Sequence, residues 1–309
     1  MRIHGAGAVL GAAALWGTAG AAGVIAFGGG GAVDSVALAA ARLVVGGVVL
    51  ALGVGLGRVA GVVRGMPPGD RWLMGAAAVA VAVYQLAFFA AVSRTGVAIG
   101  TVVAIGSGPV FTGVLAWGFE RVRPSRRWGV ATAAAVLGCA LLILGGEAAV
   151  AGSGQVAEGV ALALVGGLIY AFYAVCAARM IGRGAASDGV MGGMFGGAAL
   201  IMLPVLLVGD VGWLGTPAGL GVALYLGCAT TALAYFLYGR GLRTTPVATA
   251  ATLALAEPAV AAVLGVVVLG ERLGGVSVGG LVLLGAALVV AALPEAGARR
   301  RVGAAESSV

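Results

Sequence analysis

Long apolar segments follow one another along almost the whole chain. A bilayer core of about 30 Å requires roughly 20 apolar residues to cross it as a helix. Charged residues make up only 9% of the sequence, too few to cover a soluble protein of this size. We therefore predict an all-α polytopic membrane protein with ten transmembrane helices. The predicted spans are residues 5–27, 34–57, 71–93, 96–119, 128–146, 158–181, 189–209, 216–239, 245–269 and 275–293.

The arginine residues predict how these spans are oriented. All 18 basic residues are arginines. If both chain ends are cytoplasmic, only Arg94 and Arg272 fall in external loops, Arg42 falls inside a span, and every other arginine is cytoplasmic. Positive charge is concentrated in the cytoplasmic loops of membrane proteins. We therefore expect a multi-pass protein of the plasma membrane with both termini in the cytoplasm.

Charge, cysteine and histidine usage exclude several other classes. The net charge of +7 does not indicate nucleic-acid binding, because the arginines lie between apolar segments and not along one face. The three cysteines lie far apart inside apolar segments, which predicts neither a metal site nor a disulfide framework. His4 is the single histidine, so a histidine cluster is excluded. The expected partners are the lipid bilayer and a small molecule, with no cofactor, no metal and no predicted oligomeric state.

The chain contains one pattern twice. Residues 93–121 (SRTGVAIGTVVAIGSGPVFTGVLAWGFER) parallel residues 242–272 (LRTTPVATAATLALAEPAVAAVLGVVVLGER). Pro109 aligns with Pro258 at the same spacing that aligns Arg94 with Arg243. Each half holds five predicted helices, and an odd number makes the second half enter the membrane from the opposite side. The sequence therefore predicts two inverted five-helix repeats, an arrangement that recurs in secondary transporters.

These features resemble the EamA-like group of the drug/metabolite transporter superfamily. The resemblance rests on ten short helices in two repeats, on the sequence LWG at 15–17, and on Pro258 followed by an apolar stretch and GER at 270–272. The first repeat departs from this pattern, because its ending GFER at 118–121 comes two residues sooner after Pro109. The expected domains are a first EamA-like repeat at 1–146, an external linker at 147–157, a second repeat at 158–293 and a cytoplasmic tail at 294–309.

The resemblance implies a secondary transporter that exports small organic metabolites, such as amino acids or related compounds, or drugs, by alternating access. A channel-like protein and a non-transporting membrane assembly protein are the alternatives. An intramembrane enzyme has the least support, because a terminal histidine and one mid-span acid supply no nucleophile–base pair. The chain lacks the G-x-x-x-x-G-K-[ST] loop of ATP-driven proteins. We predict no catalytic residue.

Glu257 is an acidic residue near the middle of an apolar segment, followed directly by Pro258. A charge at this depth costs around 2.5–3.5 kcal/mol on insertion scales, so it should face the bundle interior. Pro258 cannot donate a backbone hydrogen bond to Ala254, which predicts a kink there and, by the repeat, at Pro109. We interpret Glu257 as a cavity-lining acid that acts in substrate binding or proton coupling. A protonated glutamate bonded to a neighbouring helix, and facilitated diffusion without protons, are the alternatives.

Other candidate substrate-binding residues are polar or aromatic groups inside spans, where lipid offers no hydrogen-bond partner. Arg42 could reach the outer interface, pair with Glu257 or bind an anionic group of the substrate. For the remaining candidates, packing between helices is the alternative to a cavity. These candidates are Gln85, Trp16, Tyr84, Tyr170 and Tyr173.

Overall fold

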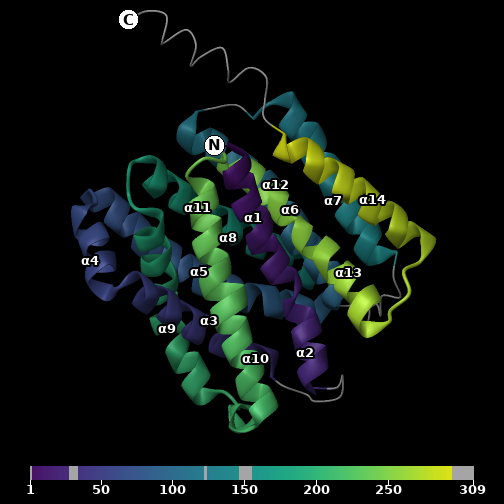
Figure 1. The fold of residues 1–309 in the computed structure, drawn as a ribbon, viewed down its shortest axis with the longest axis horizontal. Coiled ribbons are helices and arrows are strands. Elements are labelled where there is room, and N and C mark those ends of the chain that lie inside the picture. The colour runs from purple at the N-terminus through teal and green to yellow at the C-terminus, as the bar shows by residue number, and fades with distance from the viewer. Residues whose placement is uncertain (1, 28–33, 122–123, 146–154, 294–309) are drawn as a thin grey trace, which may run out of the picture.

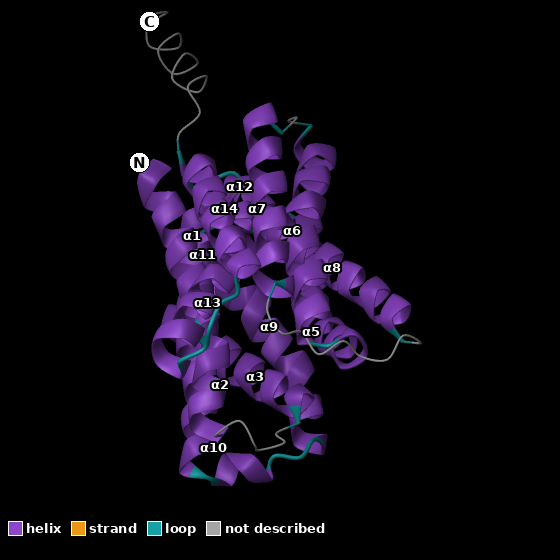
Figure 2. Ribbon diagram, turned by 90° about the vertical axis from the view of Figure 1, so that its right-hand side faces the viewer, coloured by secondary structure: helices purple, strands orange, loops and turns teal. Residues whose placement is uncertain are grey.

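The computed structural model describes residues 2–27, 34–121, 124–145 and 155–293, and every regular element within these ranges is helical (Figures 1 and 2). Ten helical segments are long and apolar enough to cross a membrane, and their ends lie within three residues of the predicted ones. The predicted all-helical fold with ten spans is confirmed. The predicted tail at 294–309, and most of the predicted linker at 147–157, lie outside the described residues.

The first half contains five spans and one additional helix. Spans one and two are followed by a short helix, α4, that was absent from the predicted spans. The elements are α1 (Arg2–Gly17) and α2 (Ala19–Phe27), which together form span one, then α3 (Ser35–Val54), α4 (Leu56–Gly65), α5 (Pro68–Thr95), α6 (Val97–Glu120) and α7 (Arg126–Leu144).

The second half also contains five spans, two of which are interrupted. Span eight includes a π-helical segment, and span nine is divided into two helices. The elements are α8 (Val156–Gly182), α9 (Ser187–Val208), the 3-10 turn η1 (Gly212–Gly215), α10 (Pro217–Gly227), the π-helical η2 (Cys228–Leu233), α11 (Ala234–Leu242), α12 (Val247–Ala254), α13 (Ala256–Leu269) and α14 (Gly275–Ala292).

Helix α4 is amphipathic and packs against α9. The side chains of Val59 and Val62 lie against Gly189 and Gly192 of α9, where a larger residue would collide with them. Arg58, on the same short helix, forms an ion pair of 2.9 Å with Asp188 at the start of α9. The helix is too short to cross a bilayer and alternates apolar with basic residues, which is why a search for long apolar segments does not find it.

The spans pack in pairs across the two halves. The second span of each half pairs with its counterpart (α3 with α9), and so does the last span (α7 with α14). The first span of each half packs instead on the third and fourth spans of the other half, α8 on α5 and α6, and α1 on α11, α12 and α13. Figure 1 shows α1 beside α11 and α7 beside α14. This reciprocal pairing is what a two-fold relation between inverted halves produces.

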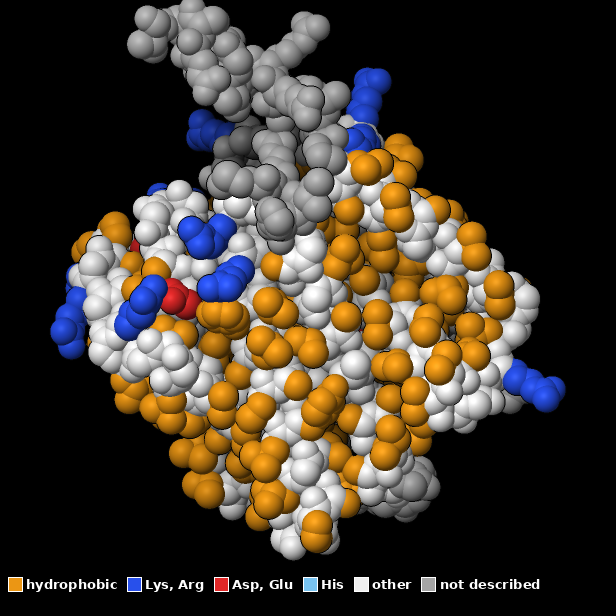
Figure 3. Space-filling view, in the orientation of Figure 1, with side chains coloured by type: hydrophobic (Ala, Val, Ile, Leu, Met, Phe, Trp, Pro, Cys, Tyr) orange, Lys and Arg blue, Asp and Glu red, His pale blue; other side chains and the backbone are white. Residues whose placement is uncertain are grey.

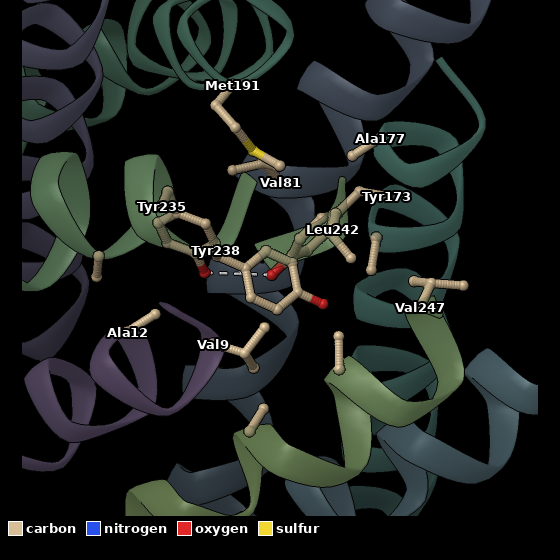
Figure 4. Packing of buried hydrophobic residues seen from close by; sticks show 14 of the residues in the cluster. Val9, Ala12, Val81, Tyr173, Ala177, Met191, Tyr235, Tyr238, Leu242 and Val247 are labelled. Carbon is tan, nitrogen blue, oxygen red and sulfur yellow. Dashed lines mark hydrogen bonds between the residues drawn. The ribbon is translucent and has the colours of Figure 1, made fainter. Parts of the chain in front are cut away.

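The outer surface is apolar and the interior is packed with aromatic and sulfur-containing side chains. Exposed leucines and valines, such as Leu207 and Val208 on α9, cover much of the molecule, as Figure 3 shows for one face. On that face the arginine side chains gather mainly near α4 and the N-terminal end. Tyr173, Tyr238 and Phe195 are among the largest fully buried side chains, and Figure 4 shows the two tyrosines in a cluster that also contains Val9 and Val81 from the first half.

Candidate functional site

A cavity of about 100 Å³ lies where the two halves meet. Its walls come from α1, α3, α5 and α6 of the first half and from α8, α11, α12 and α13 of the second. Every substrate-binding candidate proposed from the sequence lines it. These residues are Trp16, Arg42, Tyr84, Gln85, Tyr170, Tyr173 and Glu257.

The cavity contains one acidic and one basic side chain. Glu257 lies in the first turn of α13, near the middle of span nine, and Arg42 lies on α3. Both line the cavity, and they attract each other electrostatically. No ion pair joins them in the described part of the chain. Arg42 therefore lies at the same cavity as Glu257.

Aromatic rings form most of the remaining wall. Tyr84 lies between Tyr170 and Tyr173, with ring centroids 6.2 and 6.1 Å away. The ring of Trp16, from the first half, lies 5.0 Å from that of Tyr235, from the second half. Such separations are typical of edge-to-face and tilted aromatic pairs. Much of the cavity wall is therefore aromatic.

Tyrosine hydroxyls connect these rings across the interior. The hydroxyls of Tyr173 and Tyr235 lie 3.3 Å apart, and Figure 4 draws this contact as a dashed line. The hydroxyls of Tyr170 and Tyr238 are also 3.3 Å apart. Each pair joins α8 to α11, both from the second half. The two contacts orient the rings that line the cavity and satisfy hydroxyl groups that would otherwise be buried without partners.

Two hydrogen-bond donors of cavity-lining residues have no partner. They are Nε1 of Trp16 and Nε of Arg42, and both atoms are buried in the described structure. A buried donor without an acceptor costs about 1–3 kcal/mol. A ligand with acceptor oxygens would offset this cost.

The two prolines have different effects on their helices. In span nine, α12 ends at Ala254 and α13 begins at Ala256, two residues before Pro258. In α6 the helix runs continuously through Pro109. The break in span nine agrees with the proposed kink, whereas a bend at Pro109 stays a prediction. Each proline leaves the carbonyl four residues before it without its usual backbone donor. These carbonyls belong to Ile105 and Ala254, and both residues line the cavity.

The residue opposite Glu257 in the repeat is Gly108, and the structure gives a reason for this difference. A Cβ atom at Gly108 would lie 3.1 Å from Cδ1 of Tyr170, so the tyrosine ring occupies the space that a side chain would need. Tyr170 is itself a cavity wall. One half therefore contributes an aromatic ring where the other contributes a carboxylate.

Sequence reasoning missed several cavity residues. The aromatic runs at 84–89 and 235–239 contain three of them, but only Tyr84 and Gln85 were selected. The ring of Phe236, next to cavity-lining Tyr235, instead lies beneath Arg240 at 4.5 Å. The missed residues are Phe88, Phe89, Ala104, Ile105, Tyr235, Ala251 and Ala254.

The chemistry available in the cavity is that of binding. Among the described residues, no group of three or more His, Cys, Asp or Glu side chains is placed to hold a metal ion. Thr18 and Ser107 lie outside the cavity lining and donate hydrogen bonds to the backbone carbonyls of Leu15 and Ala104. Opposite charges, an amide and aromatic rings can orient a small polar molecule near the middle of the membrane.

Ten spans in two inverted halves, with a polar cavity where the halves meet, define a membrane transporter. The model of the EamA-like transporter family matches residues 3–144 and 157–293. The chain belongs to this family, whose members are transporters and not enzymes. "Uncharacterized transporter YwfM" of Bacillus subtilis (strain 168) is 38% identical over 261 residues, covering 84% of this chain and 83% of that protein.

A solved structure described as "Crystal structure of protein" has the same fold. The TM-score is 0.78 at 20% sequence identity, and the match covers 96% of this chain and 98% of that one. At this identity the likeness concerns the fold alone.

Proposed function

We propose that this transporter exports small organic metabolites by alternating access, with the cargo bound in the central cavity. The main support for this proposal is that all the polar and aromatic candidates from both halves line one cavity near mid-span. Inverted halves can exchange conformations, which gives inward- and outward-open states of similar energy. The expected orientation, with both termini in the cytoplasm, is part of the proposal.

The size of the cavity supports a small cargo. The cavity has a volume of about 100 Å³. A compact metabolite matches this space, whereas a bulky drug does not. Of the cargo classes expected for the family, we therefore favour small metabolites over drugs.

Metabolite profiling of the growth medium tests this proposal. Cells that express the protein should accumulate one or a few small metabolites outside, compared with cells that lack it. Glu257→Gln should reduce this export by roughly tenfold or more, because a hydrogen bond to a charged group is replaced by a weaker one. Glu158→Gln is the matched control, since Glu158 forms an exposed ion pair with Arg94 at 3.2 Å, away from the cavity.

Equal amounts of each variant in the membrane must be verified by immunoblotting. Unchanged export by Glu257→Gln would remove that residue from the site. Counterflow in proteoliposomes, with and without an imposed pH gradient, separates proton coupling from facilitated diffusion. Ohmic conductance in place of saturable counterflow would contradict a carrier.

A further inference from the structure

We propose that the turn between α4 and α5 binds the headgroup of an anionic phospholipid. Arg64 and Arg71 bind its phosphate, and an acyl chain lies along the exposed apolar face of α5. This site is separate from the central cavity, whose lining contains neither arginine. The inference goes beyond the proposed function and does not depend on what the protein transports.

The first argument is the way in which two arginines meet at this turn. Arg64 lies in the last turn of α4, and Arg71 lies near the start of α5. Nε of Arg71 donates to the carbonyl of Met66 at 2.9 Å, and Nη2 donates to the carbonyl of Arg64. These two bonds hold the guanidinium of Arg71 at the end of α4, beside the backbone of Arg64.

The second argument is that no acid balances this positive charge. Three ion pairs are found among the described residues, and none of them includes Arg64 or Arg71. Asp70, the acid next to Arg71, is buried and paired with Arg183 at 2.6 Å. Both arginines of the turn are exposed, so an anion can approach them. A phosphate is complementary to them, because its oxygens accept hydrogen bonds from the planar fork of arginine.

The third argument is the apolar surface that begins beside the two arginines. Trp72 directly follows Arg71 and is 83% exposed. Val79, Val83 and Leu86 continue from it along one face of α5 and are exposed as well. An acyl chain can cover such a stripe, whereas a soluble anion would leave it uncovered. Tryptophan at the end of a span is also typical of the level of the lipid headgroups.

The position of the turn in the fold agrees with a lipid ligand. Helix α4 follows the second span directly, is too short to cross a bilayer, and leads into the third span. In the orientation that we propose, the turn faces the cytoplasmic leaflet, whose anionic lipids attract basic segments. A basic turn next to an apolar stripe therefore fits an amphiphile with one anionic phosphate, and phosphatidylglycerol has this chemistry.

Lipid titration followed by native mass spectrometry tests the proposal. Purified full-length protein in a neutral detergent is titrated with phosphatidylglycerol, and separately with phosphatidylcholine, which has the same acyl chains and no net charge. The tightest site should bind phosphatidylglycerol roughly tenfold or more tightly than phosphatidylcholine. Equal affinities for the two lipids would overturn the proposal.

Variants assign this binding to the turn. Arg64→Gln should weaken the tightest phosphatidylglycerol site about fivefold, and adding Arg71→Gln should weaken it further. Arg64→Lys keeps the charge and should retain part of the affinity, which separates loss of the site from loss of folding. Arg272→Gln removes the same charge from an exposed position after α13 and should leave the affinity unchanged. An equal loss in Arg272→Gln, or none in the double variant, would refute the site.

A last comparison separates a lipid site from a site for a soluble anion. sn-Glycerol 3-phosphate carries the anionic group without acyl chains, and at millimolar concentration it should not displace phosphatidylglycerol. Trp72→Ala should weaken phosphatidylglycerol binding several-fold, because it removes apolar surface that the acyl chain covers. Displacement by glycerol phosphate, or full affinity in Trp72→Ala, would overturn the proposal of a lipid ligand.

Discussion

At the scale of single residues, glycines decide how closely the halves approach each other at the cavity. A Cβ atom at Gly17 of α1 would lie 2.6 Å from the carbonyl oxygen of Glu257. A Cβ atom at Gly167 of α8 would lie 2.8 Å from the carbonyl oxygen of Ala104, a cavity residue on α6. In each case the first span of one half touches the backbone of the proline-containing span of the other. The absence of a side chain therefore sets the width of the site.

Replacing Gly17 with alanine should destabilise the protein. The new methyl group would collide with the Glu257 carbonyl and with Cβ of Val260, 2.8 Å away, so backbone atoms must move. Overpacking of this kind costs about 1–3 kcal/mol. Thermal unfolding in detergent measures the change, and export should fall with it because Glu257 shifts.

The matched control for this substitution is Gly7→Ala on the same helix. A Cβ atom at Gly7 meets nothing within 4 Å, so the alanine should be neutral or slightly stabilising. Equal behaviour of the two variants would show that the close approach of α1 to α13 is not required.

At the scale of the helices, irregular segments lie beside the cavity. Span nine breaks between α12 and α13 at the residues that flank the site, and Leu255 there donates to the Thr252 carbonyl in a tighter turn. Span eight contains the π-helical η2 just before Tyr235. There Thr230 and Thr231 both donate to the carbonyl of Leu226. Such irregular backbone in a membrane is tolerated where side chains or protein satisfy its polar groups, and it often marks a functional site.

Substituting Pro258 with alanine should join α12 and α13. The restored backbone donor can bond to the carbonyl of Ala254, which favours a continuous helix. We expect a stability gain of about 1–3 kcal/mol and a loss of export of roughly tenfold or more, since a straight helix carries Glu257 away from the cavity. Pro109→Ala in the continuous α6 is the control and should change both quantities less. A larger effect at Pro109 would contradict this interpretation.

An ion pair joins helices α5 and α8 at each end, although the two helices belong to different halves. Asp70, buried at the start of α5, bonds to Arg183 after α8 at 2.6 Å, and Arg94 bonds to Glu158 at 3.2 Å at the other ends. Asp70→Asn should cost about 1–3 kcal/mol, because the acid is buried while its arginine is half exposed. The exposed pair should contribute at most about 1 kcal/mol, so Glu158→Gln is the control. Chemical unfolding in detergent compares them, and equal losses would show that burial of Asp70 is not decisive.

At the scale of the whole molecule, the reciprocal packing of the two halves places each proline-containing span against the first span of the other half. The cavity is therefore built from both halves, and it changes whenever one half moves against the other. Because the number of spans is even, the start of the first span and the end of the last span lie on the same side of the membrane.

Labelling of single cysteines tests the orientation expected from the arginines. The native cysteines Cys139, Cys176 and Cys228 are first replaced by serine. A membrane-impermeant maleimide should label Arg272→Cys, after α13, in intact cells. Gly182→Cys, at the end of α8, should be labelled only after permeabilisation. The reverse pattern would invert the proposed topology.

Much of this molecule is encoded locally, and the rest depends on contacts between distant segments. The ten spans followed from the sequence because the length and hydropathy of a segment are local properties. The seven cavity candidates followed because a polar or aromatic residue inside an apolar segment is visible in a short stretch of sequence. The helix α4 was missed because its stability comes from packing on α9 and not from a long apolar run. The position of the break in span nine was only approximate, because neighbouring helices decide where the freed backbone relaxes.

The sequence by itself determined that the chain crosses a membrane ten times, that its halves are inverted repeats, and which residues are too polar or too aromatic to face lipid. Only the tertiary structure decided that Arg42 and Glu257 line one cavity, that Tyr235 lines it while Phe236 does not, and that Tyr170 fills the place of a side chain at Gly108. The physical reason is rotation. Which face a helix presents to the interior is set by the side chains of helices far away in sequence, and hydropathy within one span carries little of that information.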